Sequence, residues 1–351
     1  MDYSQYRELF FVKIRFSLIC CAIMITTSLS GCLVTDDDTI PDDDDALQTL
    51  RIKLISHIWG PNGFPERSPE LVLEDINETG FQNLSNLGQI DRLEITSEFG
   101  IPSVVYHFHP AEEPVDRLIV YHQGHMGGVE LGSRTLSYFL ERGYSVLGYA
   151  MPLKGPNYID EITLPGGSNY SVGSNQHAEL IPLEENSVSA MRVFVEPIIV
   201  GLNYAESHFD YQSIDMIGIS GGGWTTTLAA AIDYRIEHSY PVAGSIPFHL
   251  RDAKENESDF EQNRARPVYD VANYLDWYTL SGFGEGRRQL QILNQVDPCC
   301  YYSEGREDAI ISYQDDIRSV GVDFEVFIDT EHVGHEISIS ALRVIYDDIQ
   351  R

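Results

Sequence analysis

Positive charge is scarce in this 351-residue chain, which has 23 lysine and arginine residues against 54 aspartate and glutamate residues. The formal net charge is -31, so the field around the protein repels other polyanions. This charge excludes nucleic acid as a partner and argues against polyanionic substrates.

Cysteine is also scarce, with five residues in the chain. Three of them, Cys20, Cys21 and Cys32, lie near the N-terminus, which leaves only the adjacent pair Cys299 and Cys300 for the rest. A disulfide framework is therefore excluded. A hydrophobic core of roughly 300 residues must carry the stability, and that length suffices. We expect the adjacent pair to be two thiols rather than a strained vicinal disulfide.

The long apolar run of the chain lies near its N-terminus. Lys13 and Arg15 precede the apolar residues 16–29, and small residues follow. A positive flank, a short apolar core and small residues describe a secretory signal. The alternative is an uncleaved membrane anchor, but the segment is short for a span of about 20 residues. We therefore expect residues 1–31 to be a signal peptide.

Leu29-Ser30-Gly31-Cys32 resembles the bacterial lipobox. The resemblance implies that the Cys32 thiol takes a diacylglyceryl group and becomes the N-terminus after cleavage. It places the protein in the bacterial cell envelope, held to a membrane by the lipid. Leu33 follows the cysteine in place of an aspartate, which in the proteobacterial sorting rule favours the outer membrane, facing the periplasm or the cell surface.

Seven aspartates and a proline occupy residues 35–46. Such a segment repels itself and cannot bury a core, so we expect residues 32–46 to be a lipidated, extended tether. A calcium loop is the alternative, but the required glycine and glutamate spacing is absent. No repeat or long linker follows, so residues 47–351 are expected to form one domain.

Gly218-Ile219-Ser220-Gly221-Gly222 lies between the apolar residues 214–217 and a helical stretch of small residues, 224–232. A G-x-S-x-G at a strand-to-helix turn holds its serine in a strained conformation and needs small neighbours. The hydroxyl is then exposed at the carboxyl edge of a parallel sheet. We expect Ser220 to be a nucleophile; the alternative is a glycine-rich turn with a buried serine.

An acid follows the serine in the chain, as the order Ser, Asp, His of such sites requires. Residues 288–296 predict a strand that runs directly into Asp297-Pro298. The proline cannot extend the sheet ladder, so the strand ends there. Asp297 is therefore expected at the carboxyl edge, level with Ser220.

Two histidines follow the last predicted strand, residues 322–328, in the loop 329–336. His335 comes after Gly334 and before a helical pattern, which favours it as the catalytic base; His332 is the alternative. The two histidines are alternatively metal ligands, because residues three apart share a helical face. No third ligand motif such as H-E-x-x-H accompanies them, so we expect no metal and no cofactor.

Acyl transfer at Ser220 needs two backbone N–H groups for the developing oxyanion. Gly221 is expected to supply one. The glycine-rich segment 122–128, which follows a strand predicted at 117–121, supplies the other. Within it we assign His125, with Gln123 as the alternative because an insertion blurs the register. A metal-binding role for His122 and His125 is a less simple explanation.

Together these motifs resemble the alpha/beta hydrolases, of the esterase and dienelactone-hydrolase-like sort, over residues 85–351. The resemblance implies an α/β fold with a mostly parallel sheet flanked by helices. It also implies that Asp233 and Arg235 tie a helix end. The segments 151–179 and 247–286 are expected to form the walls or a partial lid of the substrate cleft. Aromatic residues there are candidates for stacking on a sugar or an aromatic acyl group, with ordinary loop packing as the alternative: Tyr158, Tyr170, Tyr274, Trp277 and Tyr278.

Other segments complete the expected sheet and helices. Strands are predicted at 51–58, 90–98, 101–109, 144–150 and 239–246, and helices at 187–207 and 337–351. His107 and His109 share one face of their strand, and with no third ligand in sight we expect them to face solvent.

The set of Ser220, Asp297 and His335 implies a serine hydrolase that cleaves carboxylic esters through an acyl-enzyme, acting on a small-molecule or saccharide ester. A peptidase of the same fold is one alternative. A ligand-binding surface lipoprotein on an inactive scaffold is another, but the complete catalytic set argues against it.

The lipobox interpretation makes a direct prediction. Metabolic labelling with a palmitate analogue should tag the wild-type protein, because Cys32 carries the acyl chains. Cys32→Ser should remain unprocessed and unlabelled in the same cells. Equal labelling of the two proteins would show that Cys32 is not the anchor.

Overall fold

The computed structural model describes residues 40–351 except 42, 98, 174–176, 186–188 and 257–258. The expected signal peptide, Cys32 and most of the tether lie outside the described residues, so these expectations stay predictions. The described residues form one compact unit. Among their helices, none combines the length and the apolar character that crossing a membrane requires.

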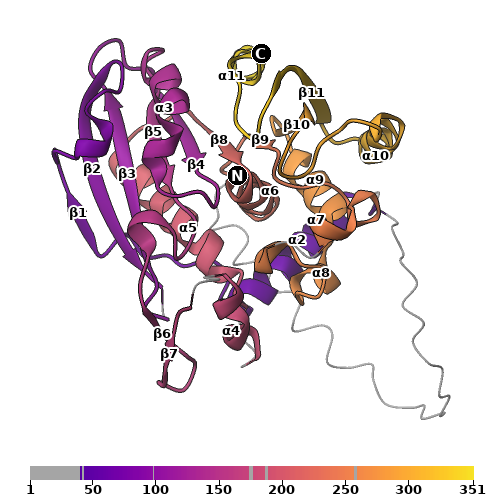
Figure 1. The fold of residues 1–351 in the computed structure, drawn as a ribbon, viewed down its shortest axis with the longest axis horizontal. Coiled ribbons are helices and arrows are strands. Elements are labelled where there is room, and N and C mark those ends of the chain that lie inside the picture. The colour runs from indigo at the N-terminus through magenta and orange to yellow at the C-terminus, as the bar shows by residue number, and fades with distance from the viewer. Residues whose placement is uncertain (1–39, 42, 98, 174–176, 186–188, 257–258) are drawn as a thin grey trace. The chain divides into compact units, whose positions relative to one another are not determined.

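Nine strands of the described residues form one mixed sheet, in the order β1-β2-β3-β5-β4-β8-β9-β10-β11 (Figure 1). The strands are β1 (Leu71–Leu73), β2 (Leu87–Thr96), β3 (Pro102–Pro110), β4 (Arg117–His122), β5 (Ser145–Tyr149), β8 (Ser213–Ile219), β9 (His238–Val242), β10 (Arg288–Val296) and β11 (Phe324–Val333). The pairs among β1, β2, β3 and β5 are antiparallel, and all pairs from β5 to β11 are parallel. The predicted, mostly parallel sheet is confirmed.

Helices cover both faces of this sheet. They are α2 (Asp44–Trp59), α3 (Ser133–Leu140), α4 (Ile181–Glu185), α5 (Arg192–His208), α6 (Gly221–Ile232), α7 (Ala253–Asn256), α8 (Val268–Val271), α9 (Tyr274–Gly282), α10 (Glu307–Ser319) and α11 (Ile339–Ile349). In β4, Ile119 and Tyr121 share a core cluster with α3 and α11, whereas Leu118 and Val120 share one with α5 and α6. Successive side chains of a strand point to opposite faces, so the two helix pairs lie on opposite sides.

The segment 51–58 is part of helix α2, so its prediction as a strand is wrong. The Asp43 side chain accepts a hydrogen bond from the Ala46 N–H at 2.8 Å, which caps the helix start. Leu47, Leu54 and Ile58 are buried with helical spacing. The helix packs against α6 and α8 (Figure 1). The last aspartates of the expected tether, from position 43, therefore begin an ordered helix.

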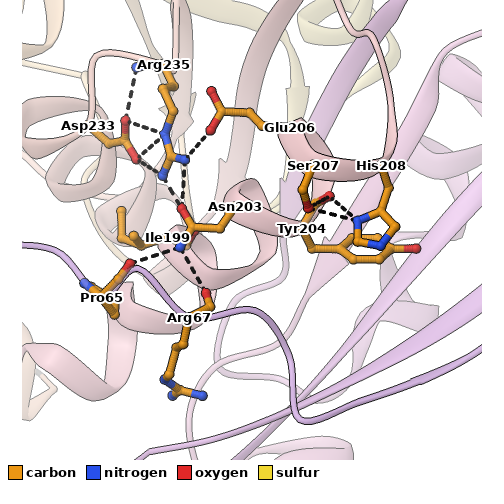
Figure 2. Close-up of polar contacts among 10 residues, drawn as sticks. All are labelled: Pro65, Arg67, Ile199, Asn203, Tyr204, Glu206, Ser207, His208, Asp233 and Arg235. Carbon is orange, nitrogen blue, oxygen red and sulfur yellow. Dashed lines mark hydrogen bonds and ion pairs between the residues drawn. The ribbon is translucent and has the colours of Figure 1, made fainter. Parts of the chain in front are cut away.

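A polar network ties the end of α6 to α5 (Figure 2). The Arg235 guanidinium donates to Asp233 Oδ2 at 2.6 Å and to Asn203 Oδ1 at 2.9 Å. Asn203 in turn donates to the backbone oxygens of Pro65 and Arg67. The expectation that Asp233 and Arg235 tie a helix end is confirmed.

Three of the five candidate stacking residues follow the alternative, ordinary packing. Tyr274, Trp277 and Tyr278 are fully buried in α9, where they form part of the hydrophobic core. Tyr170 donates to Glu179 and Tyr158 donates to Asp160. Burial in the core stabilises the fold more than exposure at a cleft does, because it removes the large apolar area of these three side chains from water.

His107 is completely buried, so the expectation that it faces solvent is wrong. Its ring packs edge-on against Phe209 at 4.8 Å between ring centroids, and its Nε2 lies 2.9 Å from the Tyr211 hydroxyl. His109 is half-buried, with Nε2 2.9 Å from Asp91 Oδ2. The segment after α5 covers this part of β3, which strand alternation alone does not reveal.

The position of α2 predicts a stability effect. Leu54 is fully buried, so Leu54→Ala should lower the free energy of unfolding by about 2–5 kcal/mol through lost burial and a cavity. Ile52→Ala, on the exposed side of the same helix, should change it by less than about 0.5 kcal/mol. Urea unfolding measures both. Equal, small effects would contradict the packing of α2 on the core.

Candidate active site

Ser220 occupies the sharp turn between β8 and α6. Its backbone has φ 57° and ψ -124°, a conformation that costs a residue with a side chain on the order of 1–3 kcal/mol. The Ser220 N–H donates to Val242 O at 2.9 Å, and the residue remains half-buried. The geometry is that of a nucleophile elbow, as the motif predicts.

Two glycines let the loop after β4 lie directly on this turn. A Cβ on Gly222 would lie 2.1 Å from His122 O, and one on Gly124 would lie 2.8 Å from both Ile219 O and Ser220 Cβ. Real Cβ atoms do not approach so closely, so larger residues would push loop and turn apart.

Asp297 and His335 meet at the carboxyl ends of the neighbouring parallel strands β10 and β11. His335 Nδ1 donates to Asp297 Oδ2 at 2.8 Å. Asn294 Nδ2 donates to the same oxygen at 2.9 Å, and the Cys299 N–H donates to Oδ1 at 2.8 Å. These donors fix the Asp297 carboxylate, which in turn orients the His335 ring.

The same contacts tune both groups. Burial alone lowers the pKa of His335, but the hydrogen bond and charge of Asp297 outweigh it, and the net pKa is raised from its usual value. Burial alone raises the pKa of Asp297, but the hydrogen bond and charge of His335, with further donors, bring it below its usual value. Both shifts favour the charged form of each group, so Asp297 can stabilise positive charge on His335.

His332 lies on β11 rather than in a loop, because this strand continues to Val333. Its Nδ1 is 3.3 Å from Asp329 Oδ2, and neither ring nitrogen has a hydrogen bond among the described residues. The predicted loop 329–336 therefore begins only after Val333. A strand and a loop do not share a helical face, so the reason for joining His332 and His335 as metal ligands is lost.

Ser220 and His335 line one pocket of about 560 Å³. Its walls come from the loop after β4 (His125), the loop after β10 (Cys299 to Tyr301) and both long insertions. The insertions contribute Ala178 and, from the second, Glu255, Asp259, Phe260, Gln262, Asn263 and Arg266. The expectation that the insertions wall the cleft is confirmed. His335 Nε2 is buried without a hydrogen-bond partner among the described residues.

The oxyanion donors assigned to Gly221 and His125 stay a prediction, and their backbone surroundings are compatible with it. Gly221 is the first residue of α6, where N–H groups have no acceptor within the helix. The alternative, Gln123, is excluded because its N–H donates to Tyr149 O at 2.9 Å. Within the described residues no backbone acceptor takes the His125 N–H.

The His125 side chain makes a contact that the sequence did not reveal. Its Nε2 lies 2.8 Å from Glu261 Oε1, and Glu261 Oε2 lies 2.9 Å from His177 Nδ1. Glu261 is completely buried and His177 nearly so. These residues come from the two insertions, and no local motif marks either.

The remaining candidates near the site have other surroundings. Burial lowers the pKa of His122 to about 4, and its Nδ1 lies 2.9 Å from Gln123 O, so this ring is neutral and internal. Cys299 and Cys300 are not joined by a disulfide, as expected. Their backbone N–H groups, rather than their sulfur atoms, hold Asp297.

Comparison with solved structures identifies the fold. The chain is similar to Methylesterase BT1017 with a TM-score of 0.63 and 15% identity, over 88% of this chain and 64% of that one. It is similar to an acetyl xylan esterase from Paenibacillus sp. R4 with a TM-score of 0.57 and 15% identity, over 89% and 97% of the two chains. It is also similar to Pyrococcus horikoshii acylaminoacyl peptidase, with a TM-score of 0.52 and 14% identity, over 77% of this chain and 42% of that one.

No protein-family model matches the sequence, and no curated protein matches it significantly. The chain spans 64% of the length of the methylesterase it resembles. At these identities the likeness concerns the fold. The sheet order, the elbow and these neighbours together show that the chain has the alpha/beta-hydrolase fold.

The two histidines predict opposite results. His335→Ala should abolish nearly all hydrolysis of a short acyl ester. Of the two histidines, it is His335 that contacts Asp297 and lines the pocket. His332→Ala, three residues away, should keep most of the activity. Both variants are compared with wild type by initial rates at saturating ester. The reverse ranking would move the base to β11.

Proposed function

We propose that this protein is a serine hydrolase that cleaves carboxylic esters through an acyl-enzyme. The observation that carries the proposal is the pocket shared by Ser220 and His335, with Ser220 held at a strained elbow and His335 hydrogen-bonded to Asp297. The three groups come from three different strand ends. Such a set is the pattern of nucleophile, base and orienting acid.

In this mechanism Ser220 Oγ attacks the ester carbonyl carbon while His335 Nε2 takes the hydroxyl proton. The imidazolium then gives that proton to the leaving alcohol, and water repeats the sequence to release the acid. Asp297 stabilises the imidazolium and keeps the Nδ1 proton in place. The N–H groups of Gly221 and His125 bind the oxyanion of each tetrahedral intermediate.

The substrate class is a small-molecule or saccharide ester. The pocket of about 560 Å³ has the volume of a small-molecule site, and the similar structures include a methylesterase and an acetyl xylan esterase. The likeness to an acylaminoacyl peptidase supports one competing activity, amide cleavage. Comparing purified-protein turnover of matched acyl esters and peptide amides separates the two.

The proposal includes a place in the cell. A lipid on Cys32 and the acidic residues after it would hold the catalytic domain at the bacterial envelope, on the outer membrane. The sequence Leu29-Ser30-Gly31-Cys32 and the preceding apolar run support this part. It is independent of the chemistry at Ser220.

Ser220→Ala tests the chemistry. The variant should fold at least as stably as wild type, because the methyl group makes no new contact, yet lose ester hydrolysis by roughly a million-fold. Ser319→Ala, at an exposed serine, should leave kcat/KM unchanged. Hydrolysis retained by Ser220→Ala would refute the mechanism. A wild type inactive on acyl esters from acetyl to long chain would favour a ligand-binding protein on an inactive scaffold.

The pKa of His335 predicts the pH dependence. A general base must be neutral, and the pKa of His335 is raised from its usual value, so kcat/KM should rise with pH through a midpoint above that of an unperturbed histidine. Asp297→Asn removes the charge that raises this pKa, so its midpoint should move to lower pH while the plateau falls. Stopped assays from pH 5 to 9 measure both profiles. An unchanged midpoint in Asp297→Asn would show that His335 is not the titrating base.

A further inference from the structure

A buried carboxylate lies between two imidazoles in the wall of the pocket. Glu261 is completely buried, with Oε1 2.8 Å from His125 Nε2 and Oε2 2.9 Å from His177 Nδ1. One donor atom from each residue lies within 4.8 Å of the other two. The three residues come from the loop after β4 and from both insertions, so the fold assembles the group from distant segments.

The two contacts of His177 need more donors than a neutral ring supplies. Its Nε2 lies 2.8 Å from Pro152 O, and its Nδ1 faces Glu261. Both neighbours are acceptors, whereas a neutral imidazole has only one N–H. The pair of contacts is satisfied by a second proton, or by a proton on Nε2 and a metal ion at Nδ1.

The outer contact of His177 matches that of a metal-bound histidine. Such a ring commonly donates its other N–H to a backbone carbonyl or a carboxylate, which fixes the ring orientation. For His177 that acceptor is Pro152 O. His125 has a looser ion-pair contact, with Asp259 Oδ2 3.6 Å from Nδ1. One ligand atom from each of His125, His177 and Glu261 lies within 4.8 Å of the other two.

The burial of the carboxylate favours a cation. Glu261 is completely buried, and each of its oxygens faces an imidazole nitrogen. A buried carboxylate needs a positively charged partner. A divalent ion held between the three side chains would supply that charge.

We propose that His125, His177 and Glu261 bind one divalent transition-metal ion, with Zn²⁺ the best fit to two imidazole nitrogens and a carboxylate. The ion would sit in the pocket wall, because His125 lines the pocket together with Ser220. Three protein ligands leave a position for water or a substrate oxygen. The site goes beyond the proposed ester hydrolysis and does not depend on it.

In two other groups of potential ligands among the described residues, no histidine has an acceptor at both ring nitrogens. In the group of Asp91, His107 and His109, each ring has one contact that a single N–H satisfies, with Tyr211 or with Asp91. In the group of Cys299, Cys300 and His335, the neighbouring sulfur and burial raise the pKa of the Cys300 thiol. That opposes the thiolate form that binds metal. Among these three groups of described residues, the Glu261 cluster alone has a histidine with an acceptor at both ring nitrogens.

Metal content tests the proposal directly. Full-length protein without a histidine tag is stripped with chelator, dialysed against Zn²⁺ and analysed by elemental mass spectrometry and calorimetry. We expect one Zn²⁺ per chain. Glu261→Gln and His125→Ala should lose it, the second being the safer variant for folding because His125 is partly exposed. His238→Ala should keep it, because His238 pairs with Asp215 at 2.7 Å outside any such group.

The controls separate this site from the other possibilities. Ser220→Ala should bind Zn²⁺ as wild type does, so loss of hydrolysis and loss of metal are distinguishable. With Co²⁺ as probe, the visible spectrum should show nitrogen and oxygen ligation. A sulfur-to-cobalt charge-transfer band would place the ion on Cys299 and Cys300, and loss of metal in Asp91→Asn alone would place it on β2 and β3. Either result overturns the proposal.

Absence of stoichiometric Zn²⁺ in well-folded wild type would also overturn it. The cluster would then be a protonated bridge that fastens the loop after β4 to the two insertions. Circular dichroism and thermal unfolding of each variant establish that metal is compared between folded proteins.

Discussion

The close approach of the loop after β4 to the turn at Ser220 is the constraint on which the site depends. Backbone meets backbone there, since a Cβ on Gly222 would lie 2.1 Å from His122 O. This approach brings the segment that carries His125 beside the first turn of α6. It also leaves Ser220 at φ 57°, a strain that the surrounding sheet and helix must hold. A side chain at either glycine would push the loop away from the turn that holds Ser220.

The site also needs Asp297 and His335 to lie next to each other, and the parallel strands bring them together. Because β10 and β11 run side by side in the same direction, their carboxyl ends bring Asp297 and His335 to one edge of the sheet. Local donors then fix the acid. Asn294 and the Cys299 N–H bind its two oxygens, so the loop with two cysteines serves the site through its backbone. The orientation of His335 follows from this fixed carboxylate.

The sequence was informative wherever function depends on local geometry. The glycine-flanked serine predicts a sharp strand-to-helix turn from a few neighbouring residues. In the same way, the proline after Asp297 predicts that the strand ends at the acid. The positions of Ser220 and Asp297 in the fold were predicted for that reason. His335 was preferred over His332 on the same kind of local cue, and its contact with Asp297 at 2.8 Å agrees.

The errors arose where distant segments decide the outcome. Ile52 and Leu54 alternate like strand residues, but capping by Asp43 and packing on α6 and α8 make the segment a helix. His107 is buried by residues more than one hundred positions away. Glu261 and His177 have no neighbouring motif, and only the fold brings them to His125. Periodicity reports the face of an element but not what covers it.

The most direct test of the account is the site of covalent modification by a fluorophosphonate. The reagent reacts with a serine activated by a neighbouring base, so it distinguishes a working elbow from an inactive scaffold. Purified wild-type protein is treated, digested and mapped by mass spectrometry. The account predicts one adduct per chain, located on Ser220, and its disappearance when His335 is replaced by alanine. An unmodified protein, or an adduct on another serine, would contradict it.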